Sequence, residues 1–253
     1  MEKIEFPKLY TEFAKYYDRL ESQYRDYELE AKWLSEILAE RNARDIVDIS
    51  CGTGSHVSLL SQRLECRLNA MDASEEMVKI AKGKAGKRVE ILLADFTISP
   101  YRKSSFDAAL CMYWSLAGLN DDLVRRLFSE TSSILKKDGL LIFDVENSNG
   151  IKEDKINIPF IDAFFEDEKV AVIRTNFSTK SAPDIVDWQA YYMLESNGVS
   201  EMKTDRMNLR FYSKSQLESL LQEAGFKTLQ VLSGPYTEYE EHSPSLYLVA
   251  EKI

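Results

Sequence analysis

Histidine, cysteine, glycine and proline are all scarce in this chain of 253 residues, which has two histidines, three cysteines, ten glycines and six prolines. Two histidines exclude a multi-histidine metal centre, and so few glycines and prolines exclude a fibrous or low-complexity protein. No apolar run approaches the roughly 18–20 residues of a membrane span. The first ten residues lack the apolar core of a secretory signal. We therefore expect a cytoplasmic protein with no membrane partner.

The cysteines do not form a recognisable framework. Cys51, Cys66 and Cys111 are odd in number, widely spaced and without a Cys-x-x-Cys pair. Such a pattern predicts neither a disulfide scaffold nor a zinc site. We expect reduced, mostly buried thiols, and no metal site.

Basic residues are also in deficit, because 32 Lys and Arg face 42 Asp and Glu, for a net charge of −10. A protein that grips nucleic acid by charge needs a basic face, so we expect no nucleic-acid partner. Hydrophobic residues make up 44% and charged residues 29%, which is ordinary for a globular chain with a sizeable core.

The middle of the chain alternates short apolar runs with amphipathic stretches. Helices are expected after the glycines at 52 and 54, from Ser74 to about residue 83, and over 119–135. This alternation predicts βαβ units and a parallel sheet. The strands are expected at 46–49, 67–71, 89–93, 106–112 and 139–145.

The flanking segments follow other patterns. Residues 10–39 carry aromatic and apolar side chains at steps of three and four, which predicts helix. Residues 151–212 predict an antiparallel insertion, with strands at 169–176, 185–195 and 200–212 and a hairpin turn at Asn197-Gly198. A helix from Ser213 and strands at 226–232 and 246–250 then complete the chain. We expect a lid over 1–40, a main domain of 41–150 and 213–253, and an insertion of 151–212.

The most informative segment is the turn Asp48-Ile49-Ser50-Cys51-Gly52-Thr53-Gly54, between an expected strand and an expected helix. Glycines there let a ligand approach the backbone at a helix N-terminus. A phosphate-binding P-loop would need Gly-Lys-Ser/Thr, which is absent. The dinucleotide fingerprint would need a third glycine at Val57. Neither nucleotide motif is met.

The turn resembles the first motif of class I S-adenosylmethionine (SAM) methyltransferases, usually Asp-x-Gly-Cys-Gly-Thr-Gly, with Ser50 in place of the first glycine. Asp72, the pair Asp95-Phe96, and the runs 106–112 and 135–143 resemble the later motifs in the same order. The resemblance implies an α/β, Rossmann-like, seven-stranded and mostly parallel sheet with helices on both faces. It also implies SAM as the cofactor.

The resemblance further implies the cofactor contacts. Asp72 would bind the ribose hydroxyls, Asp95 and Phe96 the adenine, and Asp48 the loop and the amino end of SAM. The full implied cofactor set is Tyr17, Tyr27, Asp48, Ser50, Cys51, Gly52, Gly54, Asp72, Ala73, Met77, Asp95, Phe96 and Met112.

The layout is similar to small-molecule N-methyltransferases, namely TDP-aminosugar N,N-dimethyltransferases and glycine N-methyltransferase-like enzymes. An aromatic N-terminal segment and a β insertion would enclose the methyl acceptor. His56 is interpreted as structural, and no catalytic residue is assigned, with Tyr113 and Tyr17 as the candidates. The expected acceptor-binding residues are Tyr113, Trp114, Trp188 and Tyr212.

The implied reaction is direct in-line methyl transfer, in which positioning supplies most of the rate. An amine that arrives neutral needs little acid–base help, whereas a hydroxyl needs a base or a metal. The sequence offers neither a clear base nor a metal site, so it favours N-methylation of a small molecule. We expect a monomer or a homodimer. O- or C-methylation, a non-catalytic SAM-binding module and an NAD-dependent oxidoreductase remain open.

Overall fold

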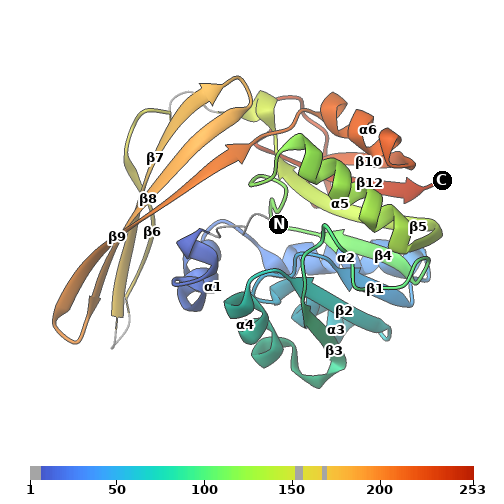
Figure 1. The fold of residues 1–253 in the computed structure, drawn as a ribbon, viewed down its shortest axis with the longest axis horizontal. Coiled ribbons are helices and arrows are strands. Elements are labelled where there is room, and N and C mark those ends of the chain that lie inside the picture. The colour runs from blue at the N-terminus through green and yellow to red at the C-terminus, as the bar shows by residue number, and fades with distance from the viewer. Residues whose placement is uncertain (1–6, 152–155, 167–169) are drawn as a thin grey trace.

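The computed structural model describes residues 7–151, 156–166 and 170–253, apart from the side chain of Asp162. The main sheet has eight strands in the order β11-β10-β12-β5-β4-β1-β2-β3 (Figure 1). Its members are β1 (Asp45–Asp48), β2 (Arg67–Asp72), β3 (Val89–Leu93), β4 (Phe106–Cys111), β5 (Leu135–Glu146), β10 (Phe226–Gly234), β11 (Thr237–Glu238) and β12 (Ser245–Lys252).

The sheet is parallel from β3 to β5, and β12 and β10 complete it in antiparallel pairing. This confirms the mostly parallel α/β fold, with one addition. The expected seven strands are joined by β11, a two-residue strand that pairs irregularly with β10. Two residues carry no periodicity, so the sequence pattern could not have predicted it.

Helices cover both faces of the sheet. Alternate residues of a central strand point to opposite faces, so they pack against different helices. Ala108 and Leu110 pack with one set, α2 (Tyr27–Glu40), α3 (Ser55–Arg63) and α4 (Glu75–Ala85). Ala109 and Cys111 pack with the other, α5 (Asp121–Ile134) and α6 (Lys214–Glu223). The prediction of helices on both faces is confirmed.

The N-terminal segment is less helical than the sequence predicted. It consists of two 3₁₀ turns, η1 (Lys8–Tyr10) and η2 (Ala14–Tyr16), and a five-residue helix, α1 (Tyr17–Glu21). Helix α2 then starts at the capping residue Asp26, whose side chain accepts a hydrogen bond from the Leu29 N–H. Helix α2 packs in the main core, whereas the residues before it pack on the insertion. The aromatic and apolar residues of 10–39 therefore do not form one continuous helix face.

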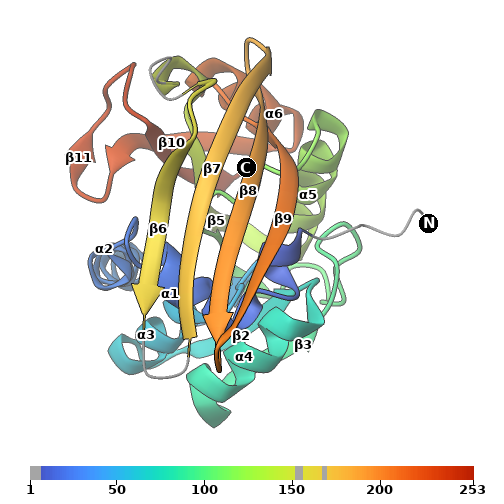
Figure 2. The ribbon, with the colours of Figure 1, turned by 90° about the vertical axis from the view of Figure 1, so that its left-hand side faces the viewer.

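The insertion is a separate four-stranded antiparallel sheet, with the order β6-β7-β8-β9. Its strands are β6 (Phe160–Glu166), β7 (Val170–Ala182), β8 (Ile185–Ser196) and β9 (Val199–Arg210). Three of these match the expected strands, although Lys169 lies outside the described residues, and β6 was not predicted. Figures 1 and 2 show this sheet standing apart from the main sheet, with α1 between them.

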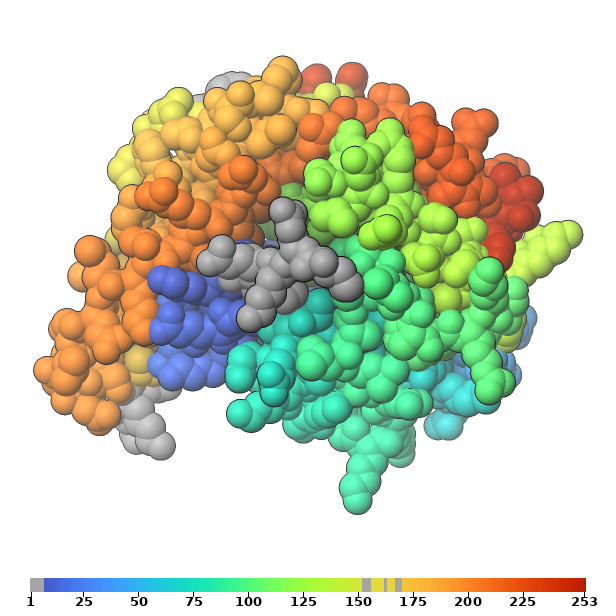
Figure 3. All heavy atoms as spheres, viewed as in Figure 1, coloured from blue at the N-terminus to red at the C-terminus, as the bar shows by residue number. Residues whose placement is uncertain are grey.

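The strand order reverses between β1 and β4, which have connections on opposite sides of the sheet. In open α/β sheets such a switch point opens a crevice at the carboxyl ends of the strands, where ligands bind. The N-terminal segment, drawn in blue in Figure 3, lies between the orange insertion and the teal α4 beside this crevice. Across the described residues, no helix is long and apolar enough to cross a membrane.

Candidate functional site

A cavity of about 450 Å³ lies at the switch point. Such a volume falls within the range of small-molecule sites, roughly 300–1,000 Å³. Its walls come from the turn after β1, the end of β2, the loop after β4, the N-terminal segment and strand β9. Of the implied cofactor set, the lining includes Tyr17, Tyr27, Ser50, Cys51, Gly52, Asp72, Ala73, Met77, Phe96 and Met112.

The two glycines of the turn have different structural tasks. Gly52 has φ +52°, and its N–H donates a hydrogen bond to Asp72 Oδ2 at 2.8 Å. Gly54 has φ +79°, and a Cβ there would lie 2.9 Å from the Cβ of Ala81 on α4. Gly54 therefore permits close packing of α3 on α4, and the structure does not bring it to the cavity surface as the sequence implied. Only Gly52 lies on that surface.

Asp72 is the anionic carboxylate on the cavity wall within the described residues. It accepts hydrogen bonds from the Gly52 N–H and, at 2.9 Å, from the Ser74 N–H. Burial raises the pKa of this carboxyl, while the backbone donors oppose the rise. A carboxylate has about four acceptor positions, so the backbone donors do not use all of them and a ribose hydroxyl can still donate to this group. The residue therefore fits the ribose of SAM.

Asp48 lies beneath the turn and not on the cavity surface. It is 2% exposed and accepts a hydrogen bond from the Ser50 N–H at 3.1 Å. Burial raises its pKa to about 6. Its observed contact is therefore with the loop, one of the two roles that the resemblance implied.

The adenine end is formed by side chains from three segments. Phe96, Met77 and Ala73 line the cavity and offer an apolar slot next to Asp72. Asp95 is not among the lining residues, because its carboxylate turns back to accept the Thr97 N–H at 2.8 Å. An aromatic ring and a thioether both pack well on a flat aromatic group, so Phe96 and Met77 suit the adenine of SAM.

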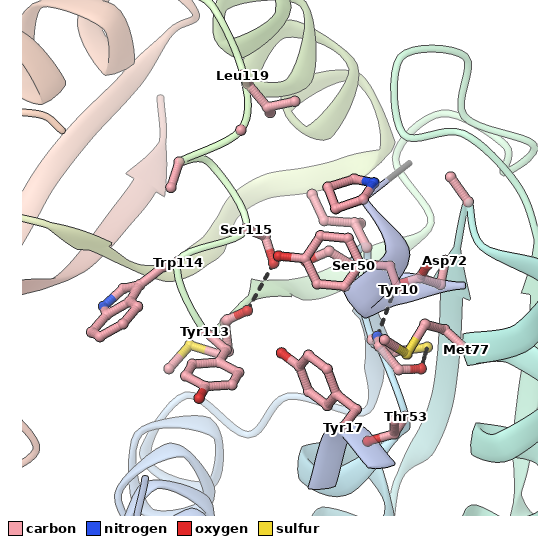
Figure 4. A pocket seen from close by; sticks show the side chains of 18 of the residues that line it. Tyr10, Tyr17, Ser50, Thr53, Asp72, Met77, Tyr113, Trp114, Ser115 and Leu119 are labelled. Atoms are coloured by element: carbon pink, nitrogen blue, oxygen red, sulfur yellow. Dashed lines mark hydrogen bonds between the residues drawn. The ribbon is translucent and has the colours of Figure 1, made fainter. Parts of the chain in front are cut away.

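Another part of the lining is a group of tyrosines. Figure 4 shows the rings of Tyr10, Tyr17 and Tyr113 around the same space. Tyr17 lies edge-on to Tyr113 with ring centroids 6.0 Å apart, and Tyr27 does the same at 6.0 Å. Burial raises the pKa of Tyr10, Tyr17, Tyr27 and Tyr113, so their phenols stay neutral. No hydrogen bond is formed by the hydroxyls of Tyr10, Tyr17 and Tyr27 within the described parts of the chain.

The loop after β4 closes the site. Tyr113 and Trp114 both line the cavity and have φ of +66° and +55°. Aromatic residues rarely adopt this left-handed conformation, which is typical of functional sites. The Trp114 Nε1–H is buried without a hydrogen-bond partner among the described residues. The loop is fastened to the insertion by the Arg210 N–H, which donates to the Ala117 carbonyl at 2.6 Å.

Two expected acceptor-binding residues are not brought to the cavity. Trp188 on β8 is 8% exposed and packs with Phe13 and Leu20 in the core between the insertion and the N-terminal segment. Tyr212 is 1% exposed, and its hydroxyl donates to the Leu119 carbonyl at 3.2 Å. Trp188 lies on the inner face of its sheet, where it packs in this core. Strand alternation predicts that such a residue faces inward, but not whether it faces a core or a cavity.

Several lining residues were missed from the sequence. Tyr10 was missed because no pattern marks residues 7–10 as cavity wall. His56 was interpreted as structural, yet it lines the cavity, and its Nε2 lies 2.8 Å from Glu30 Oε2. Residues 115, 117–119 and 206–209 also line the cavity, and their irregular loop and strand-edge positions give no sequence signal.

Within the described ranges, no three His, Cys, Asp or Glu side chains gather in a way that could hold a metal ion. The polar groups of the cavity lining include the Asp72 carboxylate, the His56 imidazole, the Cys51 thiol, the Arg206 guanidinium and several hydroxyls.

Comparison with known proteins supports the same reading of the fold and the cofactor. Residues 46–139 match the family described as a methyltransferase domain. An uncharacterised protein of Methanocaldococcus jannaschii is 32% identical over 154 residues, which are 60% of this chain and 55% of that protein. A putative methyltransferase of Geobacillus sp. (strain WCH70) is 29% identical over 252 residues, covering 96% of this chain and 99% of the relative.

Other relatives have names that specify an acceptor. The glycine/sarcosine N-methyltransferase of Aphanothece halophytica is 25% identical over 248 residues, covering 95% of this chain and 88% of that protein. The malonyl-[acyl-carrier protein] O-methyltransferase of Marinomonas sp. (strain MWYL1) is 28% identical over 152 residues, 56% of this chain and 54% of that protein.

Solved structures share the fold. A SAM-dependent methyltransferase from Clostridium acetobutylicum superposes with a TM-score of 0.82 at 21% identity, covering 96% of this chain and 98% of that chain. The sugar N-methyltransferase KedS8 from Streptoalloteichus has a TM-score of 0.78 at 20% identity, covering 100% of this chain and 96% of that chain. The motif spacing, the switch-point cavity and the matched domain over residues 46–139 together support a class I S-adenosylmethionine-dependent methyltransferase.

Proposed function

We propose that this protein methylates the nitrogen of a small-molecule amine, with SAM as the methyl donor. The observation that carries the proposal is the group of neutral aromatic side chains on the cavity wall around Tyr113. Tyr10, Tyr17, Tyr113 and Trp114 offer phenol oxygens and ring faces there. Such a wall suits a hydrogen-bearing or cationic nitrogen, because neutral phenols accept N–H hydrogen bonds and rings attract cations.

The residues act by holding and orienting the two reactants. SAM, when bound, supplies a methyl group on a positively charged sulfur. Asp72 would hold the ribose, and Phe96 and Met77 would hold the adenine. The tyrosines exclude water from the acceptor and fix its approach, and orientation of this kind is worth effective molarities of about 10⁵–10⁸ M. No residue needs to form a covalent bond with the acceptor.

The neutral state of the phenols matters for the choice of acceptor. Because burial keeps Tyr17 protonated at physiological pH, its hydroxyl can accept from an N–H as well as donate. Arg206 of β9 also lines the cavity, so a carboxylate group carried by the same amine would have a cationic partner there. Relatives named as glycine/sarcosine N-methyltransferases agree with an amine.

O-methylation is the second candidate, and one contact favours it. His56 lines the cavity and lies 2.8 Å from Glu30 Oε2. Glu30 has a lowered pKa, with the hydrogen bond from His56 and the charge of Arg25 outweighing the effect of burial. An imidazole held by a carboxylate can take the proton of a hydroxyl acceptor, which needs a base. A relative named as an O-methyltransferase agrees with this alternative.

The two candidates are separated by turnover with matched acceptors. Purified protein and SAM are incubated with primary and secondary amines, and with the alcohol and the carboxylic acid of the same carbon skeleton. We expect release of S-adenosylhomocysteine with the amines at least about tenfold faster than with their oxygen counterparts. Faster release with the alcohols or acids would replace N-methylation by O-methylation. SAM binding with no turnover across all three series would instead indicate a non-catalytic module.

A further inference from the structure

Tyr113 occupies a backbone conformation that must be held by its surroundings. With φ of +66°, it lies in the left-handed region, where a bulky side chain is strained. Such residues persist only where neighbouring contacts over-determine them. Since Tyr113 lines the cavity, the contacts that hold it also set the shape of the acceptor end.

The first anchor comes from inside the main sheet. The Tyr113 N–H donates to Asp144 Oδ1 of β5 at 2.5 Å. Asp144 is fully buried and its Oδ2 pairs with the Arg25 guanidinium at 2.7 Å. The same guanidinium lies 4.5 Å from the centroid of the Tyr113 ring. Backbone and ring are thus both fixed by one ion pair.

The second anchor comes from outside the main sheet. The Tyr113 hydroxyl donates to Glu21 Oε2 of α1 at 2.5 Å. Glu21 Oε1 pairs with Arg174 Nη1 of β7 at 2.5 Å, and the two side chains are only 11% and 4% exposed. The contact therefore runs from the insertion, through the N-terminal segment, to the cavity wall. A hydrogen bond to a buried charged group is among the stronger ones in proteins.

We propose that Glu21, held by Arg174, is a positioning residue that sets the Tyr113 side chain for the methyl acceptor. This inference rests on the proposed function, because it takes the Tyr113 end of the cavity as the acceptor end. The insertion is then more than a cover, since one of its buried arginines orients a residue of the acceptor wall. Neither Glu21 nor Arg174 is among the residues that line the cavity, so both act through Tyr113.

The cleanest test removes only the hydroxyl. Tyr113→Phe leaves the Glu21–Arg174 pair and the Arg25 stacking in place. We expect the KM for the amine turned over best in the acceptor panel to rise about tenfold, the loss expected for one hydrogen bond to a charged group. The Kd for SAM, measured by calorimetry, stays within about twofold, because the adenosine end is untouched.

Tyr236→Phe is a matched control. Tyr236 also has positive φ, +59°, and its hydroxyl donates to a glutamate, Glu36 Oε2, at 2.6 Å. It is 52% exposed and lies outside the cavity lining. This variant loses the same type of hydrogen bond, so we expect its KM and Kd to remain those of the wild type.

A second variant tests Glu21 without relying on an acceptor. Glu21→Gln keeps the shape but removes the charge that Arg174 and Tyr113 share. Hydrogen exchange of the full chain should show the amides of residues 113–119 exchanging about tenfold faster, while those of β1 and β5 keep their protection. Glu12→Gln is the control, because Glu12 pairs with Lys203 and also joins the N-terminal segment to the insertion. It should leave residues 113–119 unchanged.

The outcomes separate this inference from the proposed function. Unchanged exchange at 113–119 in a folded Glu21→Gln variant would overturn the positioning role, whatever the acceptor. Faster exchange together with a wild-type KM in Tyr113→Phe would also overturn it, since the loop would then move without consequence for the acceptor. If no amine is methylated, the proposed function fails, and the exchange experiment alone decides whether Glu21 holds Tyr113.

Discussion

At the scale of single residues, the site depends on carboxylates held by backbone donors. Asp72 and Asp48 both accept from the glycine-rich turn, but only Asp72 faces the cavity. Asp72 therefore bears on ligand affinity, whereas Asp48 bears on the stability of the turn. Each acid is the last residue of its strand, and the sequence implied cofactor contact for both, with the ribose for Asp72 and the amino end of SAM for Asp48.

Asp72→Asn should weaken SAM binding by about 10- to 100-fold, because the amide presents N–H groups where the carboxylate accepts from the Gly52 and Ser74 N–H groups. Calorimetry with SAM checks this. Asp107→Asn is the control, since Asp107 Oδ2 also accepts two backbone N–H groups, from Arg44 and Asp45, at the other end of the sheet. An unchanged affinity in the Asp72 variant would remove the ribose assignment.

Asp48→Asn should stabilise the fold in a pH-dependent way. Burial raises the pKa of Asp48 to about 6 in the folded state, above its unfolded value of about 3.9. Its favourable contribution is therefore present below pH 4 and is lost as the pH rises towards 6. Asparagine cannot ionise, so its advantage in unfolding free energy should grow between pH 4 and pH 6.5, by roughly 2 kcal/mol, and then level off. Urea unfolding at several pH values measures it, and a pH-independent difference would contradict it.

At the scale of elements, close packing of α3 on α4 fixes the turn that carries the ligand-facing backbone. Gly54 is the contact point, with φ +79° and no room for a Cβ beside Ala81. Gly54 is thus required for two reasons, its left-handed backbone and the close contact between the two helices. The sequence assigned this glycine to the cofactor site, whereas in the structure it serves helix packing.

Gly54→Ala should destabilise the fold by about 2–4 kcal/mol, combining left-handed strain with the overpacking of α3 against α4. Gly225→Ala is the matched control, because Gly225 has the same φ, +79°, but nothing lies within 4 Å of its would-be Cβ. Strain alone should cost the control about 1–2 kcal/mol. Denaturant unfolding of the two variants compares them, and equal losses would show that packing adds nothing at Gly54.

The central elements could be predicted from the sequence because their signals are periodic. The strands around 46–49, 89–93 and 106–112 and the turn at Gly52 each carry buried apolar runs or glycine chemistry. The edges of the cavity could not be predicted in this way. Tyr10 and residues 206–209 reach the site only through tertiary packing, and Trp188 is turned away from it by strand alternation. Buried partners such as Glu21 and Arg174 are 153 positions apart, which no local pattern connects.

At the scale of the whole molecule, three parts of the chain meet at one cavity. The main domain supplies the glycine-rich turn, Asp72 and the loop after β4, while the N-terminal segment and β9 of the insertion supply other parts of the lining. The segment packs its aromatic residues on the insertion, as in the stacked pair of Phe13 and Tyr192 with ring centroids 4.1 Å apart. Ligand binding should therefore stabilise the N-terminal segment and the insertion as well as the glycine-rich turn.

SAM should raise the midpoint of thermal unfolding by roughly 5–11 °C at about 100 times its Kd, because a ligand that binds only the folded state adds about 2.7 kcal/mol there. NAD at the same concentration should produce no shift, since the turn has Val57 where the dinucleotide fingerprint needs glycine. Differential scanning fluorimetry compares the two. Stabilisation by NAD and none by SAM would overturn the cofactor assignment.

The thiol of Cys51 lines the same cavity, and burial with the nearby charges of Asp48 and Asp72 raises its pKa far above the ordinary value. Only a thiolate is a strong nucleophile, and a thiolate beside a sulfonium would capture the methyl group. Burial and the two nearby carboxylates favour the protonated thiol, so we expect Cys51 to resist methylation by a bound sulfonium. Mass spectrometry of the protein after prolonged incubation with SAM checks this, and a methylated Cys51 would contradict it.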